Sequence, residues 1–292
     1  MTETLQSTKE RRRRRLASTP WGTYILLSFF VVVFLFPVYY LILGSFESPA
    51  QALNGLHGAI PSSLTVENYR SLSSKFFSDT ITGTLKGFYT VSTLVSALVV
   101  GGGLFVNSIA GYALARMQFR GRRFLILLVV VLVIIPFEAI AVPLYYMLSG
   151  LRNTLIVQAL PFIGSAFSIY LFYTFFLNLP PQLEEAARID GAGPWRTFIQ
   201  IILPNAKPAF ASVAILSFIQ IWSSYLWPLL MTSQVNVSPL SLAIGDLIYQ
   251  QNTPNYGLMF AFGVLMVVPM AGFFIVFQRW FIRSVASLAV KG

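Results

Sequence analysis

The sequence contains no cysteine and only one histidine, His57. Without cysteine, the chain can form no disulfide, no thiolate nucleophile and no cysteine-ligated metal site. His57 lies between apolar runs in a stretch with Asn, Gly, Pro and Ser, where we expect a solvated loop side chain rather than a catalyst. We therefore predict neither a catalytic residue nor a metal site in this chain.

Charged residues are also scarce, at 10% of 292 residues against 56% hydrophobic residues. A soluble domain is nearer ~25% charged, so this composition favours a membrane protein. A helix needs about 20 apolar residues to cross ~30 Å of hydrocarbon. Five stretches without Asp, Glu, Lys or Arg are long enough, and a sixth run is interrupted only by Glu138. The five lie between Arg15 and Glu47, Lys86 and Arg116, Arg152 and Glu184, Lys207 and Asp246, and Asp246 and Arg279.

We therefore predict an all-α integral membrane protein, with a polar tail at 1–20 and one membrane domain at 21–292. The arginines at 11–15 resemble the start of a secretory signal, but the apolar stretch after them exceeds the usual ~7–15 residues. We accordingly expect a retained first helix. The six predicted transmembrane helices span about residues 23–46, 87–115, 124–148, 155–178, 209–231 and 257–280.

The basic residues gather on one side of this predicted topology. They precede the first helix, fill the short connection between the second and third, and follow the fourth and the sixth. Because Lys and Arg near helix ends tend to stay cytoplasmic, we expect both termini and the segment 180–208 to be cytoplasmic. The same bias accounts for the formal charge of +10, so we predict no nucleic-acid partner.

The segment 180–208 is predicted to form a helix–turn–helix outside the membrane. Each of its six charged side chains would cost ~2.5–3.5 kcal/mol at the bilayer centre. Pro181 suits the start of a short helix, and Glu184 in its first turn suits the helix dipole. Glu184 and Arg188 form an i, i+4 pair, and Asp190-Gly191 ends this helix.

The second helix of this segment begins at Pro194, and we expect it to lie against the membrane bundle. Its apolar residues make an amphipathic stripe. They are Trp195, Phe198, Ile199, Ile202 and Leu203. The first helix then exposes Ala186, Ala187 and Gly191, whose small side chains suit insertion into a groove of another protein. A solvated connector explains the same residues equally well, and the spacing alone leaves both open.

A resemblance to a known family bears on this choice. Glu185-Ala186-Ala187, then Gly191 and the run Ile201-x-Leu203-Pro204 reproduce the EAA motif, E-A-A-x3-G-x9-I-x-L-P. This motif typifies the membrane subunits of ATP-binding-cassette (ABC) importers. Four further stretches resemble the carbohydrate branch, the maltose-type inner membrane permease subunits. They are NSIAGYALARMQFRGR at 107–122, EAIAVPLYYMLSGLRNT at 138–154, EEAARIDGAGPWRTF at 184–198 and the terminal VKG at 290–292.

The resemblance runs from the first helix to the C-terminus and implies a type I importer-like fold in the cell membrane. It implies that the loop docks in a cleft of a cytoplasmic ATPase. The positions carried over are Glu185, Ala186, Ala187 and Gly191, with Asp190 at the turn.

The same resemblance implies the partners. They are a second permease subunit, two copies of an ATP-binding subunit and an extracytoplasmic sugar-binding protein. The chain has no G-x-x-x-x-G-K-[ST] phosphate loop, so ATP and Mg²⁺ would be bound by the ATPase. We therefore expect that this chain binds no cofactor and is not an enzyme.

A polar stripe in the fifth predicted helix is a candidate substrate path. Gln220, Ser223, Ser224 and Trp227 recur at i, i+3, i+4 and i+7. Hydroxyl and amide groups beside aromatic rings suit a neutral sugar, whereas ordinary interhelical hydrogen bonding is the alternative. The usual family form resembles W-N-D-F-L-W-P-L, and serines replace its Asn-Asp pair here.

Two further features of the predicted helices are an acidic side chain within a span and a strip of small residues. Glu138 is the only carboxylate well inside a span, so we expect it to face the bundle interior or a wet cavity. Substrate contact, protonation, and pairing with a neighbouring Asn or Ser all fit it. In the second helix, the strip of Asn107, Gly111 and Ala115 indicates close helix packing with Asn as interhelical glue.

Together these features predict a permease subunit of an ATP-driven carbohydrate importer that works by alternating access. One alternative keeps the machine and changes the cargo to amino acids, peptides or polyols. A second is an ion-driven carrier, which would need paired charges at mid-membrane, where the sequence offers only Glu138.

Overall fold

The computed structural model describes residues 21–48, 64–77, 84–249 and 255–289, and every regular element in these ranges is helical. The prediction of an all-α protein is confirmed there. The predicted polar tail, His57 and the terminal VKG lie outside the described residues.

The chain divides into two compact units, residues 1–71 with 255–264, and residues 72–254 with 265–292. The first unit holds α2 (Trp21–Gly44), the start of α4 (Glu67–Phe77) and the first turns of α16 (Tyr256–Ala289). In it, the Asn68 amide donates to the carbonyls of Ser45 and Glu47, at 2.9 and 2.7 Å. This amide fixes the backbone just after α2.

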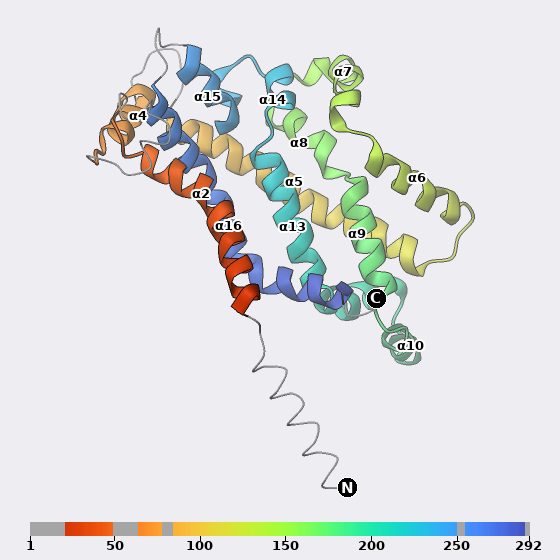
Figure 1. Cartoon of the computed structure of the whole chain (residues 1–292). Helices are drawn as coiled ribbons and strands as arrows, with labels where there is room; N and C mark the ends of the chain where they lie inside the picture. Colours follow the sequence, from red (N-terminus) through yellow and green to blue (C-terminus); the bar gives the residue numbers. More distant parts are fainter. Residues whose placement is uncertain (1–20, 49–63, 78–83, 250–254, 290–292) are drawn as a thin grey trace. The chain divides into compact units, whose positions relative to one another are not determined.

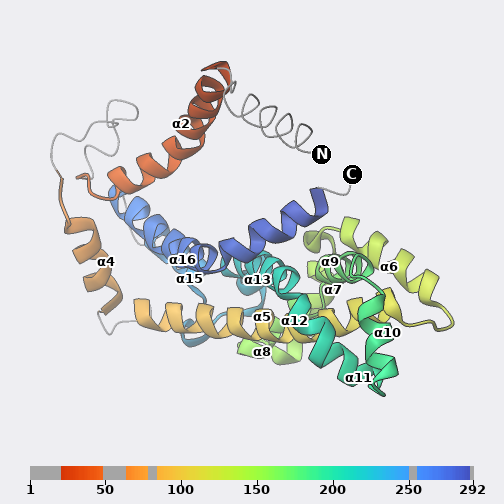
Figure 2. The same ribbon diagram turned by 90° about the horizontal axis from the view of Figure 1, so that it is seen from below.

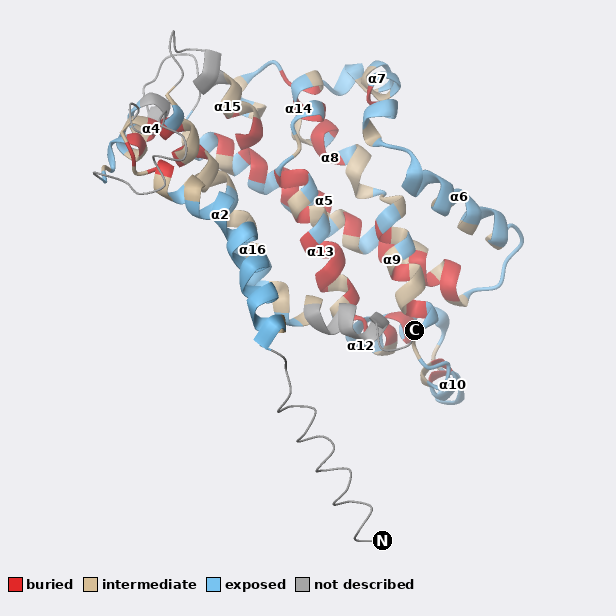
Figure 3. Ribbon diagram, in the orientation of Figure 1, coloured by how far each residue is buried: buried red, intermediate tan, exposed pale blue. Residues whose placement is uncertain are grey.

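The second unit is built around one long helix, α5. Helices α8, α9 and α13 pack along it (Figure 1). Figure 3 shows buried residues along these four helices, whereas α6 is almost wholly exposed and has no buried residue. The helices named here are α5 (Leu85–Arg116), α6 (Arg122–Ile134), α8 (Leu155–Ile163), α9 (Ala166–Leu177) and α13 (Lys207–Trp222).

The short elements of this unit gather at the two ends of the bundle (Figure 1). One end carries α7 (Phe137–Met147), η2 (Ser149–Leu151), α14 (Leu226–Met231), η4 (Val235–Val237) and α15 (Leu240–Tyr249). The opposite end carries α10 (Gln182–Ile189), α11 (Pro194–Thr197), η3 (Phe198–Ile202) and α12 (Leu203–Asn205). Figure 2 shows α10 and α11 next to each other beyond the end of α5.

Three helices in the described ranges are each long and apolar enough to cross a membrane: α2, α5 and the part of α16 from Tyr256 to Phe281. Three bent helix pairs also qualify, which gives up to six spans. The number agrees with the six predicted spans, but the third bent pair, Pro194–Asn205 with Lys207–Trp222, begins in the segment predicted to lie outside the membrane. Two predicted helices, 124–148 and 155–178, are bent pairs rather than single helices, with bends of 102° and 41°.

Proline explains the sharpest of these bends. Pro136 follows Ile135, whose ψ of 117° is extended rather than helical. A residue before proline avoids the α conformation because the ring clashes with its backbone. Helix α6 therefore ends at this point, and α7 starts again in a new direction.

The predicted fifth helix, 209–231, is also broken, between α13 and α14 at residues 223–225. Pro228 has no N–H to donate to the carbonyl four residues before it, at Ser224. The Ser241 hydroxyl donates to that carbonyl instead, at 2.6 Å. A side chain from α15 thus satisfies the backbone group that the proline frees, as membrane helices require.

The predicted packing strip on α5 is confirmed. The Asn107 side chain donates to the Ile163 carbonyl at 2.9 Å and accepts from the Ser165 N–H at 3.0 Å. A Cβ added at Gly111 would lie 2.6 Å from Cβ of Phe172 and 3.0 Å from N of Tyr173. Glycine is therefore required at 111, where the backbones of α5 and α9 approach closely.

We expect Gly111→Ala to destabilise the protein by about 1–3 kcal/mol, as overpacking of a tight contact does. Gly101→Ala in the same helix is the matched control, because no atom lies within 4 Å of a Cβ added there. Both changes raise helix propensity equally, so their difference isolates the contact with α9. Thermal unfolding in detergent measures it, and equal midpoints would contradict the close approach.

Candidate functional site

The predicted helix–turn–helix at 180–208 is present. Helix α10 carries Glu184 and Glu185 in its first turn, and Asp190 forms its C-cap. Gly191 follows in the left-handed region at φ 72°, and its N–H donates to the Arg188 carbonyl at 3.0 Å. Glycine adopts this conformation without the strain that a side chain adds. The turn therefore ends α10 sharply and sends the chain into α11 at Pro194.

The side chains that α10 exposes differ in one respect from the prediction. Ala187 is buried, with 1% exposed, rather than presented outward. The exposed residues of the motif region are Glu185, Ala186, Arg188, Asp190 and Gly191, together with Ile189 at 86%. Ala187 turns inward because α10 folds back on the helical segment that follows it, in contact with η3 and α11.

The second helix of the loop packs against the bundle as predicted, but only part of its apolar stripe is buried. Phe198 and Ile202 join a core cluster with Tyr112 of α5 and with Phe172 and Phe176 of α9. The other three residues of the stripe are exposed: Trp195, Ile199 and Leu203. The segment η3 is a π-helix, whose wider turns change the angular spacing that an α-helical stripe assumes.

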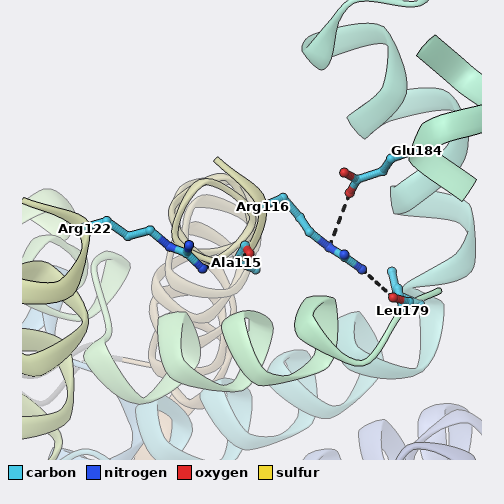
Figure 4. A network of polar contacts seen from close by, with 5 residues as sticks. All are labelled: Ala115, Arg116, Arg122, Leu179 and Glu184. Atoms are coloured by element: carbon cyan, nitrogen blue, oxygen red, sulfur yellow. Dashed lines mark hydrogen bonds and ion pairs between the residues drawn. The ribbon is translucent and has the colours of Figure 1, made fainter. Parts of the chain in front are cut away.

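Glu184 has a partner that the spacing did not indicate. Its carboxylate lies 3.4 Å from Nε of Arg116, the last residue of α5 (Figure 4). The predicted pair with Arg188 is therefore wrong. Both side chains of the observed pair are largely buried, with 14% and 10% exposed. Arg116 also donates from Nη2 to the Leu179 carbonyl.

A second arginine caps the same end of α5. Arg122 donates from Nε to the Leu114 carbonyl at 2.7 Å and from Nη2 to the Ala115 carbonyl at 3.1 Å. Basic side chains at a helix C-terminus satisfy carbonyls that have no partner within the helix. Both arginines belong to the basic connection that orients the predicted topology. Their place at a helix end was the signal for this structural role.

The candidate substrate path is not one stripe, because the break at 223–225 separates its members. Trp227 is fully buried among Phe137, Val157 and Met231, so the packing alternative holds for it. Its indole N–H donates to the Val157 carbonyl at 2.8 Å. Pro161 four residues later leaves that carbonyl without its helical donor, and Trp227 replaces the missing bond.

The three polar members lie apart from this core. Gln220 and Ser223 are exposed and Ser224 is half-buried. The Ser223 hydroxyl donates to the Ile219 carbonyl at 2.7 Å. Gln220 and Ser223 therefore remain candidates for contact with a substrate or with another subunit.

Glu138 does not face the interior of the described bundle, and its expected place at a wet cavity stays a prediction. It is exposed, in the first turn of α7 directly after the bend at Pro136. A carboxylate there is stabilised by the N-terminal end of the helix dipole. No group of three or more His, Asp or Glu side chains within the described ranges could hold a metal ion.

We expect Trp227→Phe to cost about 1–3 kcal/mol of stability, because the buried Val157 carbonyl loses its donor. The half-saturating substrate concentration for uptake should stay unchanged, because this indole is enclosed in the core. Thermal unfolding and concentration-dependent uptake separate the two effects. A higher half-saturating substrate concentration at unchanged stability would instead indicate that Trp227 contacts the substrate.

An all-helical bundle with bent spans and an EAA-type loop at one end defines a transporter membrane subunit. The family model for the "Binding-protein-dependent transport system inner membrane component" matches residues 107–287, and the chain belongs to this family. Such chains are permease subunits of ABC transporters and are not enzymes themselves.

Individual relatives match along nearly the whole chain. The arabinooligosaccharides transport system permease protein AraQ of Halalkalibacterium halodurans is 32% identical, over 96% of this chain and 100% of its own length. The diacetylchitobiose uptake system permease protein NgcG of Streptomyces coelicolor is 33% identical, over 94% and 89%. The sn-glycerol-3-phosphate transport system permease protein UgpE of Brucella abortus is 28% identical, over 90% and 95%.

A solved structure shows the same fold. It is the crystal structure of a bacterial ABC transporter involved in the import of the acidic polysaccharide alginate. The TM-score is 0.75 at 23% identity, with 93% of this chain and 98% of that chain covered. The likeness supports the type I importer-like arrangement of the helices.

Proposed function

We propose that this chain is the permease subunit of an ATP-driven importer that moves a neutral carbohydrate by alternating access. Relatives named for arabinooligosaccharide and diacetylchitobiose transport support a carbohydrate. The relative named for sn-glycerol-3-phosphate transport makes a phosphorylated polyol the second candidate substrate. The five charge-free stretches of the spans offer no Lys or Arg to balance a phosphate within the membrane, which favours the neutral sugar.

The observation that carries the ATP-driven mechanism is the outward face of α10. It presents Ile189, Ala186 and Glu185 to solvent beyond the end of α5. A large apolar side chain that is 86% exposed gains free energy when a partner covers it, on the order of 1.5–3 kcal/mol. We propose that this face inserts into a cleft of the ATPase, with the turn at Asp190 and Gly191.

The inward face of the loop explains how such docking moves the spans. Ala187 and Glu184 of α10 are buried, and η3 places Phe198 and Ile202 in the same cluster as residues of α5 and α9. Close-packed side chains transmit displacement rather than absorb it. Closure of the ATPase on α10 would therefore shift α5 and α9.

The remaining partners complete the proposed machine. A second permease subunit supplies the other half of the pore, two ATPase copies bind ATP and Mg²⁺, and an extracytoplasmic binding protein delivers the sugar. The chain lies in the cell membrane with both termini and the loop in the cytoplasm. The bias of basic residues toward that side supports this orientation.

Reconstitution of the complex in proteoliposomes tests the proposal. Labelled arabinooligosaccharides, diacetylchitobiose and sn-glycerol-3-phosphate are each offered with the cognate binding protein, with and without internal ATP. We expect ATP-dependent uptake of a neutral sugar. ATP-dependent uptake of sn-glycerol-3-phosphate alone would show that the substrate is the phosphate ester and not a neutral sugar. Uptake driven by an ion gradient without ATP would overturn the ATP-driven mechanism.

A further inference from the structure

The ion pair between Arg116 and Glu184 joins the loop to the end of α5 by charge as well as by packing. Only two α10 residues are buried, Ala187 and Glu184. The side chain of Ala187 is a single methyl group, whereas the carboxylate of Glu184 lies 3.4 Å from Nε of Arg116. Neither Nε nor Oε1 has a hydrogen-bond partner, so the 3.4 Å contact between them is an ion pair without a hydrogen bond. The two charges are therefore each other's main compensation in a largely dry site.

The ion pair lies at the connection between α9 and α10. Helix α9 ends at Leu177, and Pro180 and Pro181, which have no N–H to donate, connect it to α10. Arg116 contacts the chain on both sides of these prolines: Nη2 donates to the Leu179 carbonyl before them, and Nε pairs with Glu184 after them (Figure 4). One side chain at the end of α5 thus contacts the chain on both sides of two residues that donate no backbone hydrogen bond.

The end of α5 that carries Arg116 is itself held firmly. Arg122 donates to the Leu114 and Ala115 carbonyls, and Ala115 lies in the core cluster with Tyr112. A force on Glu184 therefore reaches a well-packed helix end rather than a free side chain. Because a guanidinium is planar, the hydrogen bond from Nη2 and the ion pair at Nε are held in a fixed relation, which resists rotation of α10 about its connection to α9.

We propose that Arg116 and Glu184 form a coupling strut, in which Arg116 is a positioning residue that fixes the angle between α10 and α5. The strut transfers the displacement of the docked α10 to α5, and this role rests on the proposed function. Without it, α10 still docks on the ATPase through its outward face. Most of its motion is then taken up at the prolines, and less sugar is imported per ATP hydrolysed.

The test is the ratio of sugar imported to ATP hydrolysed in the reconstituted full complex. Removal of one charge leaves the other buried and unpaired, which can prevent folding. The informative variant therefore replaces both, as Arg116→Met with Glu184→Leu, because apolar side chains of similar volume commonly preserve stability in such a site. Arg120→Met is the matched control, since Arg120 is exposed in the same connection after α5.

We expect the double variant to assemble with the ATPase and to unfold at the wild-type temperature. Its import per ATP should fall at least tenfold, whereas Arg120→Met keeps the wild-type ratio. The single variant Glu184→Asp retains the charge, so its import per ATP should lie between that of the double variant and that of the wild type. A folded double variant with a normal ratio would overturn the strut and leave only a packing role for the pair.

Two further results would also decide the matter. If the double variant does not fold, the ratio is measured for Arg116→Lys, which keeps the charge but lacks the planar fork. A normal ratio in that variant would overturn the strut as well, and a reduced ratio supports it. Absence of ATP-dependent import in the wild-type complex would instead contradict the proposed function.

Discussion

Gly191→Pro should abolish transport while the subunit still folds and reaches the membrane. Gly191 has φ 72°, whereas proline is confined to about −65°. The substitution also removes the N–H that donates to the Arg188 carbonyl at 3.0 Å. Forming the native turn with proline at 191 would cost ~3 kcal/mol or more. On the order of one molecule in a hundred would then have the native turn. Import measured in proteoliposomes should fall by a comparable factor.

Gly193→Ala is the control for this prediction. Gly193 has φ −70° and ψ 166°, which any residue adopts, and no atom lies within 4 Å of an added Cβ. We expect it to transport close to the wild-type rate. Wild-type import by Gly191→Pro would show that the shape of the turn after α10 does not matter, which contradicts a docked loop.

Ile189→Asp should separate the subunit from its ATPase. Ile189 is 86% exposed at the end of α10, and covering such a side chain contributes ~1.5–3 kcal/mol. Its loss alone weakens docking by about 10- to 150-fold, and a carboxylate buried in its place adds a further cost. The amount of ATPase that co-purifies with the tagged permease measures the effect.

Gln182→Asp provides the matched control, because it adds the same charge to the same helix. Gln182 is exposed in the first turn of α10, where the helix dipole favours a carboxylate. We expect normal co-purification and normal import. Equal retention of the ATPase by Ile189→Asp would mean that the outward face of α10 is not the docking surface.

Local sequence signals predicted much of this architecture. The charge-free stretches located the apolar helices, because the cost of a charge in hydrocarbon applies wherever the chain folds. The Asp190-Gly191 pair located the end of α10, since a left-handed cap depends on its own residue. The strip of Asn107 and Gly111 was likewise readable, because small residues at helical spacing permit close approach.

The features that the sequence did not disclose depend on partners distant along the chain. An i, i+4 rule could assign Glu184 only to Arg188, whereas the fold places Arg116 against it. Helical spacing put Trp227 and Gln220 on one face, but the break before Pro228 changes their relative direction. Glu138 is central in the predicted span, whereas the 102° bend at Pro136 places it in the first turn of a separate helix, α7.

The most direct measurement of the central claim uses a single cysteine in this naturally cysteine-free chain. Ala186→Cys places a thiol on the exposed face of α10 with little change in volume. The account predicts a cross-link between this thiol and the ATPase subunit in the assembled complex, and protection from a membrane-impermeant maleimide added outside intact cells. Labelling from outside, with no cross-link to the ATPase in any nucleotide state, would contradict it.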